Sequence, residues 1–160
     1  MQQGGRRAAP PLILKYGNME YVRKGSTIIL RLERGEEVVS ALKEFQTKEN
    51  VLSASFSGIG ATDNATIGVY NTAEKRYEAT QLTGDMEIAA LNGNLSRTKD
   101  GEPYIHAHAV LGRGREAHAG HLNAAIISAT AEIFVFVTDI AVSRRADPET
   151  GLNVFEFQND

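Results

Sequence analysis

The run Ile133-Phe134-Val135-Phe136-Val137 is apolar at every position, and no other feature of the sequence constrains the fold as strongly. Side chains of a strand point alternately to the two faces of its sheet, so a strand with this sequence is apolar on both faces. Both faces must then be shielded from water. We expect a helix to cover one face and a neighbouring subunit to cover the other.

One segment has the periodicity of a helix that can provide the first cover. In residues 36–48, Val38, Ala41, Leu42 and Phe45 follow the i, i+3, i+4, i+7 spacing that gathers apolar side chains into one stripe. We therefore predict one main helix at residues 36–48.

Most of the remaining sequence has the alternating or β-branched patterns of strands. The expected strands are residues 27–32, 51–62, 65–70, 77–82, 86–92, 104–111, 133–137, 141–144 and 154–157. We expect the segments 51–62 and 65–70 to pair across a turn at Asp63-Asn64. Many strands and one main helix predict an α+β fold, in which a twisted, mainly antiparallel sheet curls into a partial barrel.

The length of 160 residues, with a mass of 17.4 kDa, fits a single domain. We assign residues 1–11 to a flexible N-terminal arm and residues 12–160 to the domain. No apolar run approaches the roughly 20 residues that span a bilayer. The polar start of the chain also lacks the apolar centre of a signal peptide. We therefore expect a cytoplasmic protein with no membrane partner.

The chain contains no cysteine, which excludes disulfides, iron–sulfur clusters, thiolate zinc sites and cysteine nucleophiles. A transition-metal site must therefore use histidine, aspartate or glutamate. All the histidines of the chain fall within one short segment, and they are His106, His108, His118 and His121.

His106 and His108 are two residues apart in an expected strand, so both rings project from one face. Two such imidazoles can converge on one metal ion, and a third ligand usually comes from another segment. His121, directly after Gly120, is the best candidate for that ligand. Three neutral imidazoles suit Zn²⁺, with a fourth position left to water or a ligand, although other divalent transition metals accept the same ligand type. A His-x-His pair also arises by chance on surface strands.

Four other residues are candidates for a role near this site. Glu87 can accept the second N–H of a metal-bound imidazole or act as a general base. His118 is either an exposed turn residue or a group that supports a ligand. Arg113 and Arg115 are either solvated or form an anion-attracting rim beside the metal.

Four segments occur in an order that resembles one known family. They are Ser57-Gly58-Ile59-Gly60, Glu87-Ile88-Ala89-Ala90-Leu91-Asn92-Gly93, His106-Ala107-His108 and Gly120-His121-Leu122. The order resembles the PPC family, the "plants and prokaryotes conserved" domain, over nearly the whole chain. The resemblance implies an α+β fold, a homotrimer and zinc on His106, His108 and His121. The chain departs from the family pattern at Ala119, where a second glycine often precedes the last Gly-His.

The resemblance also connects the chain with DNA. Plant members carry the domain after AT-hook segments in nuclear DNA-binding proteins, and single-domain members are often called predicted DNA-binding proteins. The composition does not favour direct contact, because 17 Lys and Arg against 20 Asp and Glu give a formal charge of −3. Arg113-Gly114-Arg115 has the core of an AT-hook, but Glu116 stands where that motif needs proline.

These observations leave three classes of function open. The leading prediction is a metal-binding homotrimer, with zinc as the first choice, that has a regulatory or small-molecule-binding role. The alternative is a hydrolase or lyase in which the nucleophile is water on a three-His zinc site, since zinc lowers the pKa of bound water to about 7. Its candidate general base is Glu87 or Glu116. Whether the chain is an enzyme is left open. The third class is a DNA-associated role.

Overall fold

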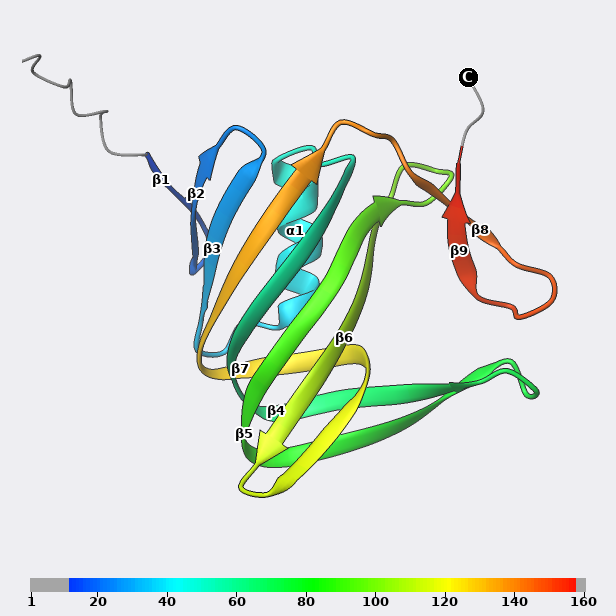
Figure 1. Cartoon of the computed structure of the whole chain (residues 1–160). Coiled ribbons are helices and arrows are strands. Elements are labelled where there is room, and N and C mark those ends of the chain that lie inside the picture. Colours follow the sequence, from blue (N-terminus) through cyan, green and yellow to red (C-terminus); the bar gives the residue numbers. More distant parts are fainter. Residues whose placement is uncertain (1–11, 158–160) are drawn as a thin grey trace, which may run out of the picture.

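The computed structural model describes residues 12–157 and has one helix and nine strands in that range. In chain order the elements are β1 (Ile13–Tyr16), β2 (Met19–Lys24), β3 (Thr27–Glu33), α1 (Val38–Lys48), β4 (Ser53–Asn71), β5 (Arg76–Arg97), β6 (Pro103–Arg113), β7 (Glu116–Thr138), β8 (Ser143–Ala146) and β9 (Asn153–Glu156). Seven strands form an antiparallel sheet in the order β1-β2-β3-β7-β4-β5-β6, and β8 and β9 form a separate hairpin (Figure 1). The predicted α+β fold is confirmed.

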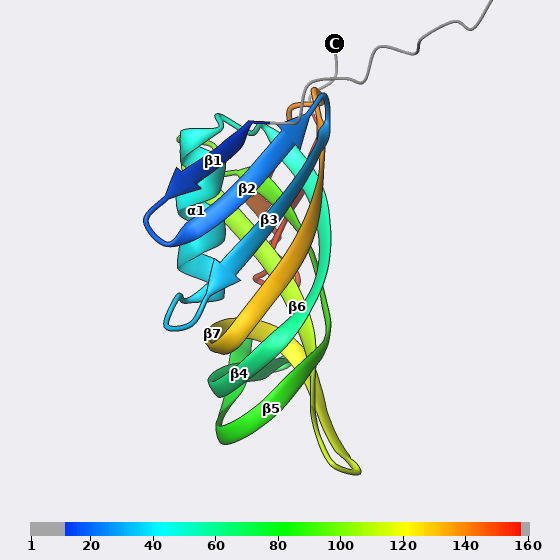
Figure 2. The ribbon, with the colours of Figure 1, turned by 90° about the vertical axis from the view of Figure 1, so that its left-hand side faces the viewer.

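The long strands bend, and the sheet closes partly on itself. The last residues of β7 pair with β3 and with the start of β4, whereas its first residues pair with β6. Since β6 also pairs with β5, the strands β4, β5, β6 and β7 form a partial ring. The helix α1 lies behind the sheet in Figure 1 and along one side of it in Figure 2.

The helix begins at Val38, two residues later than the periodicity predicts, because Glu37 caps it. The Glu37 carboxylate accepts hydrogen bonds from the backbone N–H groups of Val39 (2.9 Å) and Ser40 (2.8 Å), which lack partners inside the helix. It also accepts one from the N–H of Ala125 in β7 (3.1 Å). The apolar stripe of α1 is buried as predicted, so the cap and the stripe together fix the helix against the sheet.

The run at the end of β7 is covered on only one face by residues 12–157. Ile133 and Val135 are fully buried in the same core as α1. Phe134 and Phe136 point to the opposite face and are 45% and 50% exposed. Ile29, directly beside Phe134 in β3, is exposed as well. We call the face of β3, β7 and β4 that carries these side chains the outer face.

The predicted turn at Asp63-Asn64 is wrong, because β4 continues through it. The Thr62 hydroxyl donates to the carbonyl of Ile126 (2.6 Å) and accepts from the N–H of Asn64 (3.3 Å), so it holds the local irregularity in place. Both halves of β4 then pair with β5 and β7 on either side. The expected strands 77–82 and 86–92 likewise form one strand, β5.

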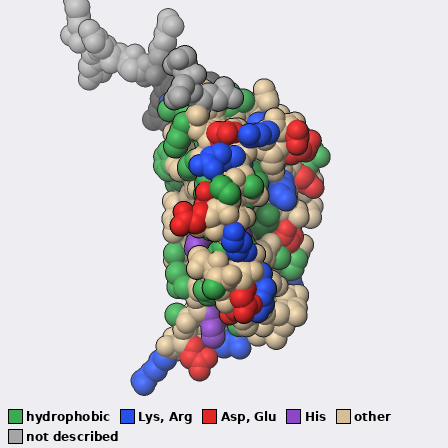
Figure 3. Space-filling view, turned by 90° about the vertical axis from the view of Figure 1, so that its right-hand side faces the viewer, with side chains coloured by type: hydrophobic (Ala, Val, Ile, Leu, Met, Phe, Trp, Pro, Cys, Tyr) green, Lys and Arg blue, Asp and Glu red, His purple; other side chains and the backbone are tan. Residues whose placement is uncertain are grey.

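Three parts of the sheet are absent from the sequence prediction, namely β1, β2 and the first half of β7. The N-terminal arm predicted at residues 1–11 lies outside the described residues. No helix within residues 12–157 is long and apolar enough to cross a membrane, and the cytoplasmic location stays a prediction. On the face shown in Figure 3, positive and negative side chains are interspersed.

Candidate metal centre

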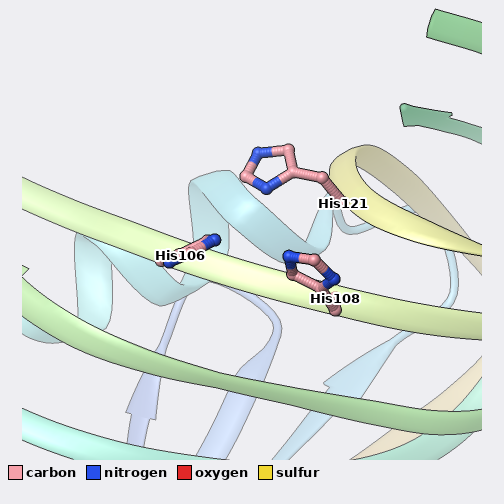
Figure 4. Close-up of side chains that lie close together, drawn as sticks. All are labelled: His106, His108 and His121. Atoms are coloured by element: carbon pink, nitrogen blue, oxygen red, sulfur yellow. The ribbon is translucent and has the colours of Figure 1, made fainter. Parts of the chain in front are cut away.

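Three of the histidines converge at one point of the partial ring. His106 and His108 project from the same face of β6, and His121 in β7 lies directly opposite His108 in the strand register. One nitrogen from each ring lies within 4.8 Å of the other two. The ring centroids are 5.3–5.5 Å apart, and each ring turns a nitrogen toward the space between them (Figure 4). The structure thus brings together the three residues that the sequence singled out.

Small residues allow this approach. Ala107 and Ala109 alternate with the histidines and are buried in the core, which directs the two imidazoles away from it. A Cβ at Gly120 would lie 2.7 Å from the carbonyl oxygen of Gly68 in β4, closer than any real side chain allows. Glycine at this position therefore lets β7 pass close to β4 immediately before His121.

Burial favours the uncharged form of two of the imidazoles. Burial lowers the pKa of His121 to about 4, and the neighbouring His106 and His108 add to the shift. Burial also lowers the pKa of His106, with a smaller effect from the positive charge of Arg144. Neutral imidazoles have a free lone pair, which is the form that binds metal ions.

A buried polar atom indicates what the space between the rings can hold. The Nδ1 atom of His121 is buried and has no hydrogen-bond partner among residues 12–157. Leaving such a group without a partner costs about 1–3 kcal/mol. Bonding to a metal ion removes that cost, so the donor set fits a divalent transition metal.

We predict that the metal-free protein becomes less stable as the pH falls from about 6.5 to about 4. The pKa of His121 is about 4 in the folded chain against an ordinary value of 6.5, so the unfolded chain binds the extra proton in this range. Urea unfolding of chelator-treated protein at several pH values measures the slope. His121→Ala should reduce the slope, and an equal slope in that variant would contradict the assignment.

The three rings form part of a cleft of about 580 Å³ between the partial ring and the β8–β9 hairpin. The ring of Tyr77 packs against His121 with centroids 4.7 Å apart. Tyr104, Arg144 and Phe155 also line the cleft. None of these residues was predicted from the sequence as part of the site. Only Tyr104 carries a usable signal, since it stands two residues before His106 on the same strand face.

The other predicted site residues lie away from the three rings. His118 is exposed in the β6–β7 hairpin and borders a separate hollow. Glu87 lies opposite Gly112, four residues along β6 from His108, which is about 13 Å.

Both candidate arginines lie at the end of the β6–β7 hairpin, Arg113 as the last residue of β6 and Arg115 in the turn. Arg113 donates to the carbonyl oxygens of Asp85 (2.9 Å) and Thr83 (2.5 Å), and Arg115 is exposed in the turn itself. The AT-hook-like tripeptide is thus the end of β6 and the turn that connects it to β7.

A family model of the Plants and Prokaryotes Conserved (PCC) domain matches residues 19–139. The chain belongs to this family. It is the PPC family that the sequence motifs indicated, so the resemblance is confirmed. A comparison with proteins of curated function gives no match.

Solved structures of PPC-like proteins share the fold over most of the chain. A candidate DNA-binding protein from Bacteroides thetaiotaomicron is 32% identical, with a TM-score of 0.83, over 88% of this chain and 99% of that one. A metal-containing protein from Archaeoglobus fulgidus is 33% identical, with a TM-score of 0.77, over 82% and 94%. A PPC protein from Pyrococcus horikoshii is 32% identical, with a TM-score of 0.76, over 91% and 99%.

Proposed function

We propose that this PPC protein binds a divalent transition metal, with zinc as the first choice, through His106, His108 and His121. The observation that carries the proposal is the convergence of three ring nitrogens within 4.8 Å of one another. The buried, unpartnered Nδ1 of His121 supports it independently. The Archaeoglobus relative, which is described as metal-containing, supports it further.

The arrangement suits a regulatory or small-molecule-binding role. Three neutral ligands leave a coordination position open, and bound zinc supplies a Lewis acid at that position. The position borders the cleft of about 580 Å³, which has room for an organic molecule. Tyr77 shields the ring of His121 from water, and burial favours the neutral form of His121 and His106 by lowering their pKa values.

We predict that alanine at His106 or His121 abolishes metal binding. Each variant leaves two imidazoles, and the loss of one ligand of three removes the site. Metal analysis of the purified proteins checks this. His118→Ala is the matched control, because His118 borders a different hollow. Unchanged metal stoichiometry in both His106→Ala and His121→Ala would overturn the proposal.

The alternative of a metal-dependent hydrolase or lyase needs a general base beside the metal. The residues described as lining the cleft include no aspartate or glutamate. Of the two bases suggested by the sequence, Glu116 is not among the residues that line the cleft, and Glu87 lies opposite Gly112 and borders other hollows. We therefore place ligand binding ahead of hydrolysis.

We propose that this chain associates with DNA only indirectly. Two solved relatives are described as candidate DNA-binding proteins. This chain carries a formal charge of −3. Its Arg113 side chain is held by carbonyls of β5 rather than free for a phosphate.

We predict no tight binding of the isolated chain to duplex DNA. Specific DNA binding usually draws much of its strength from several Lys or Arg contacts to phosphates. A gel-shift titration at about 150 mM salt measures the affinity. Sub-micromolar binding with a steep salt dependence would contradict the prediction.

A further inference from the structure

Arg144 is a buried cation at the wall of the metal-site cleft. Only 6% of its surface is exposed. Its Nε donates to the hydroxyl of Ser96 (2.9 Å), its Nη1 to the carbonyl of Asn153 (2.9 Å) and its Nη2 to Oδ1 of Asn94 (2.6 Å). The contacts to Ser96 and Asn94 hold the β8–β9 hairpin against β5, and the contact to Asn153 lies within the hairpin. All three acceptors are neutral.

The positive charge has no counter-ion in the part of the chain that is described. Within residues 12–157, no carboxylate oxygen lies within 4.0 Å of the Arg144 guanidinium. A buried charge without a partner of opposite sign is strongly unfavourable. A guanidinium has five N–H donors, so two remain after the three hydrogen bonds. The two remaining N–H groups can donate hydrogen bonds to an anion.

The register places this cation next to the histidines. Asn94, which accepts from Arg144, lies directly opposite His106 in the β5–β6 pairing. Tyr104, two residues before His106, stacks beneath the guanidinium at 4.7 Å, and Phe155 lies on it at 4.1 Å. Arg144 and the three-His group thus share one cleft.

The remaining lining defines the rest of the ligand. Aromatic and aliphatic side chains dominate it, namely Tyr70, Tyr77, Tyr104, Leu152, Val154 and Phe155. Such a wall favours an apolar or aromatic body over a bare inorganic ion. A planar guanidinium pairs best with a carboxylate or phosphate, which it can meet with two parallel N–H groups.

We propose that the cleft binds a small organic carboxylate, with the carboxylate on Arg144 and the apolar body against the aromatic wall. The proposal rests on the proposed function in one respect, since it names the ligand class for the same cleft. The Arg144 contact itself needs no metal. The ligand class and the metal can therefore be tested separately.

Calorimetric titration with benzoate tests the proposal, and benzamide serves as the uncharged probe of the same shape. Benzoate should bind the full-length protein at least about tenfold more tightly than benzamide, because a hydrogen bond to a charged group is worth roughly 1.5–3 kcal/mol. Arg144→Gln should remove this preference. Arg145→Gln is the matched control, because Arg145 is exposed, lies next in the chain and carries the same charge.

Arg144→Gln also loosens the hairpin contacts, so benzoate is compared with benzamide first in the unmodified protein. Equal binding of the two probes, or no benzoate binding, overturns the proposal. No benzoate binding is also the result expected if a carboxylate of a second copy occupies Arg144. Inorganic phosphate competing as well as benzoate likewise overturns it.

The same titration after removal of metal by a chelator separates the two proposals. A preference for benzoate that persists without metal and depends on Arg144 supports this inference, even if metal analysis shows that the three histidines bind no metal. Normal metal binding without a preference for benzoate overturns this inference but not the proposed metal site. A preference that Arg144→Gln leaves intact, but chelation removes, assigns the carboxylate to the metal and overturns the role of Arg144.

Discussion

Replacing Gly93 with alanine is expected to unfold the protein or to lower its free energy of unfolding by about 3 kcal/mol or more. Gly93 lies in β5 between Phe56 of β4 and Ala107 of β6. A Cβ at this position would overlap both the ring of Phe56 and the backbone carbonyl oxygen of His106. The ring can rotate away, but the carbonyl can only retreat if β5 and β6 separate. Such a loss is a large share of the 5–15 kcal/mol that stabilises a typical domain.

Gly112→Ala is the matched control for this prediction. Gly112 is also a strand glycine, in β6, but a Cβ there meets only the carbonyl oxygen of Glu116 at 3.9 Å. Alanine at such a site is neutral or stabilises by about 0.4–1 kcal/mol, because it restricts the unfolded chain. Urea unfolding of the two variants measures the difference. Similar stabilities for Gly93→Ala and Gly112→Ala would show that β5 and β6 accommodate the side chain.

The same glycine connects the fold with the site. Since the overlap is with the carbonyl of His106, any Gly93→Ala protein that still folds must displace the strand that carries two of the three proposed ligands. Part of the family motif around Gly93 is therefore explained by packing alone. The space around Gly112 shows that glycine in a strand does not by itself imply such a constraint.

The fold could be predicted from the sequence where a pattern is local. The stripe of α1 and the alternation of β3 follow from the spacing of apolar residues, and the structure confirms both. The prediction of a turn at Asp63-Asn64 was wrong. Asp and Asn favour turns in isolation, but the pairing of β4 with β5 and β7 holds this segment in a strand. Neither neighbouring strand can be recognised from the residues of β4.

The candidate site divides in the same way. His106 and His108 could be placed on one face from strand alternation alone. The position of His121 directly after Gly120 indicated that it could be the third ligand. Arg144 could not be found, because its partner Asn94 is 50 residues away in the chain and no local pattern joins them. The cleft exists only after the β8–β9 hairpin docks beside β5.

Replacing Phe134 with aspartate is expected to convert the homotrimer that the family resemblance implies into monomers. Phe134, Phe136 and Ile29 give the outer face an apolar patch that no other residue in the range 12–157 covers. Burying each large side chain in an interface contributes about 1.5–3 kcal/mol, and closed symmetry repeats the gain in every subunit. An aspartate at the same place would be buried without a partner, at a cost of several kcal/mol. Light scattering should give three times 17.4 kDa for the unmodified chain and about 17.4 kDa for the variant.

Two comparisons make the result interpretable. Ile140→Asp puts the same charge at another exposed apolar position, after the end of β7, and should leave the trimer intact. The proposed metal ligands all come from one chain, so the Phe134→Asp monomer should keep its metal. Phe136 is connected to His106 across the sheet by neighbouring residues in register, Ser55 in β4 and Asn94 in β5. Phe136 and His106 are therefore about 14 Å apart on the same face. The apolar patch and the metal site share this face but no residues. A mass near 17.4 kDa for the unmodified chain would show that the outer face needs no partner, and a mass near twice that value would retain the patch argument but reject three subunits.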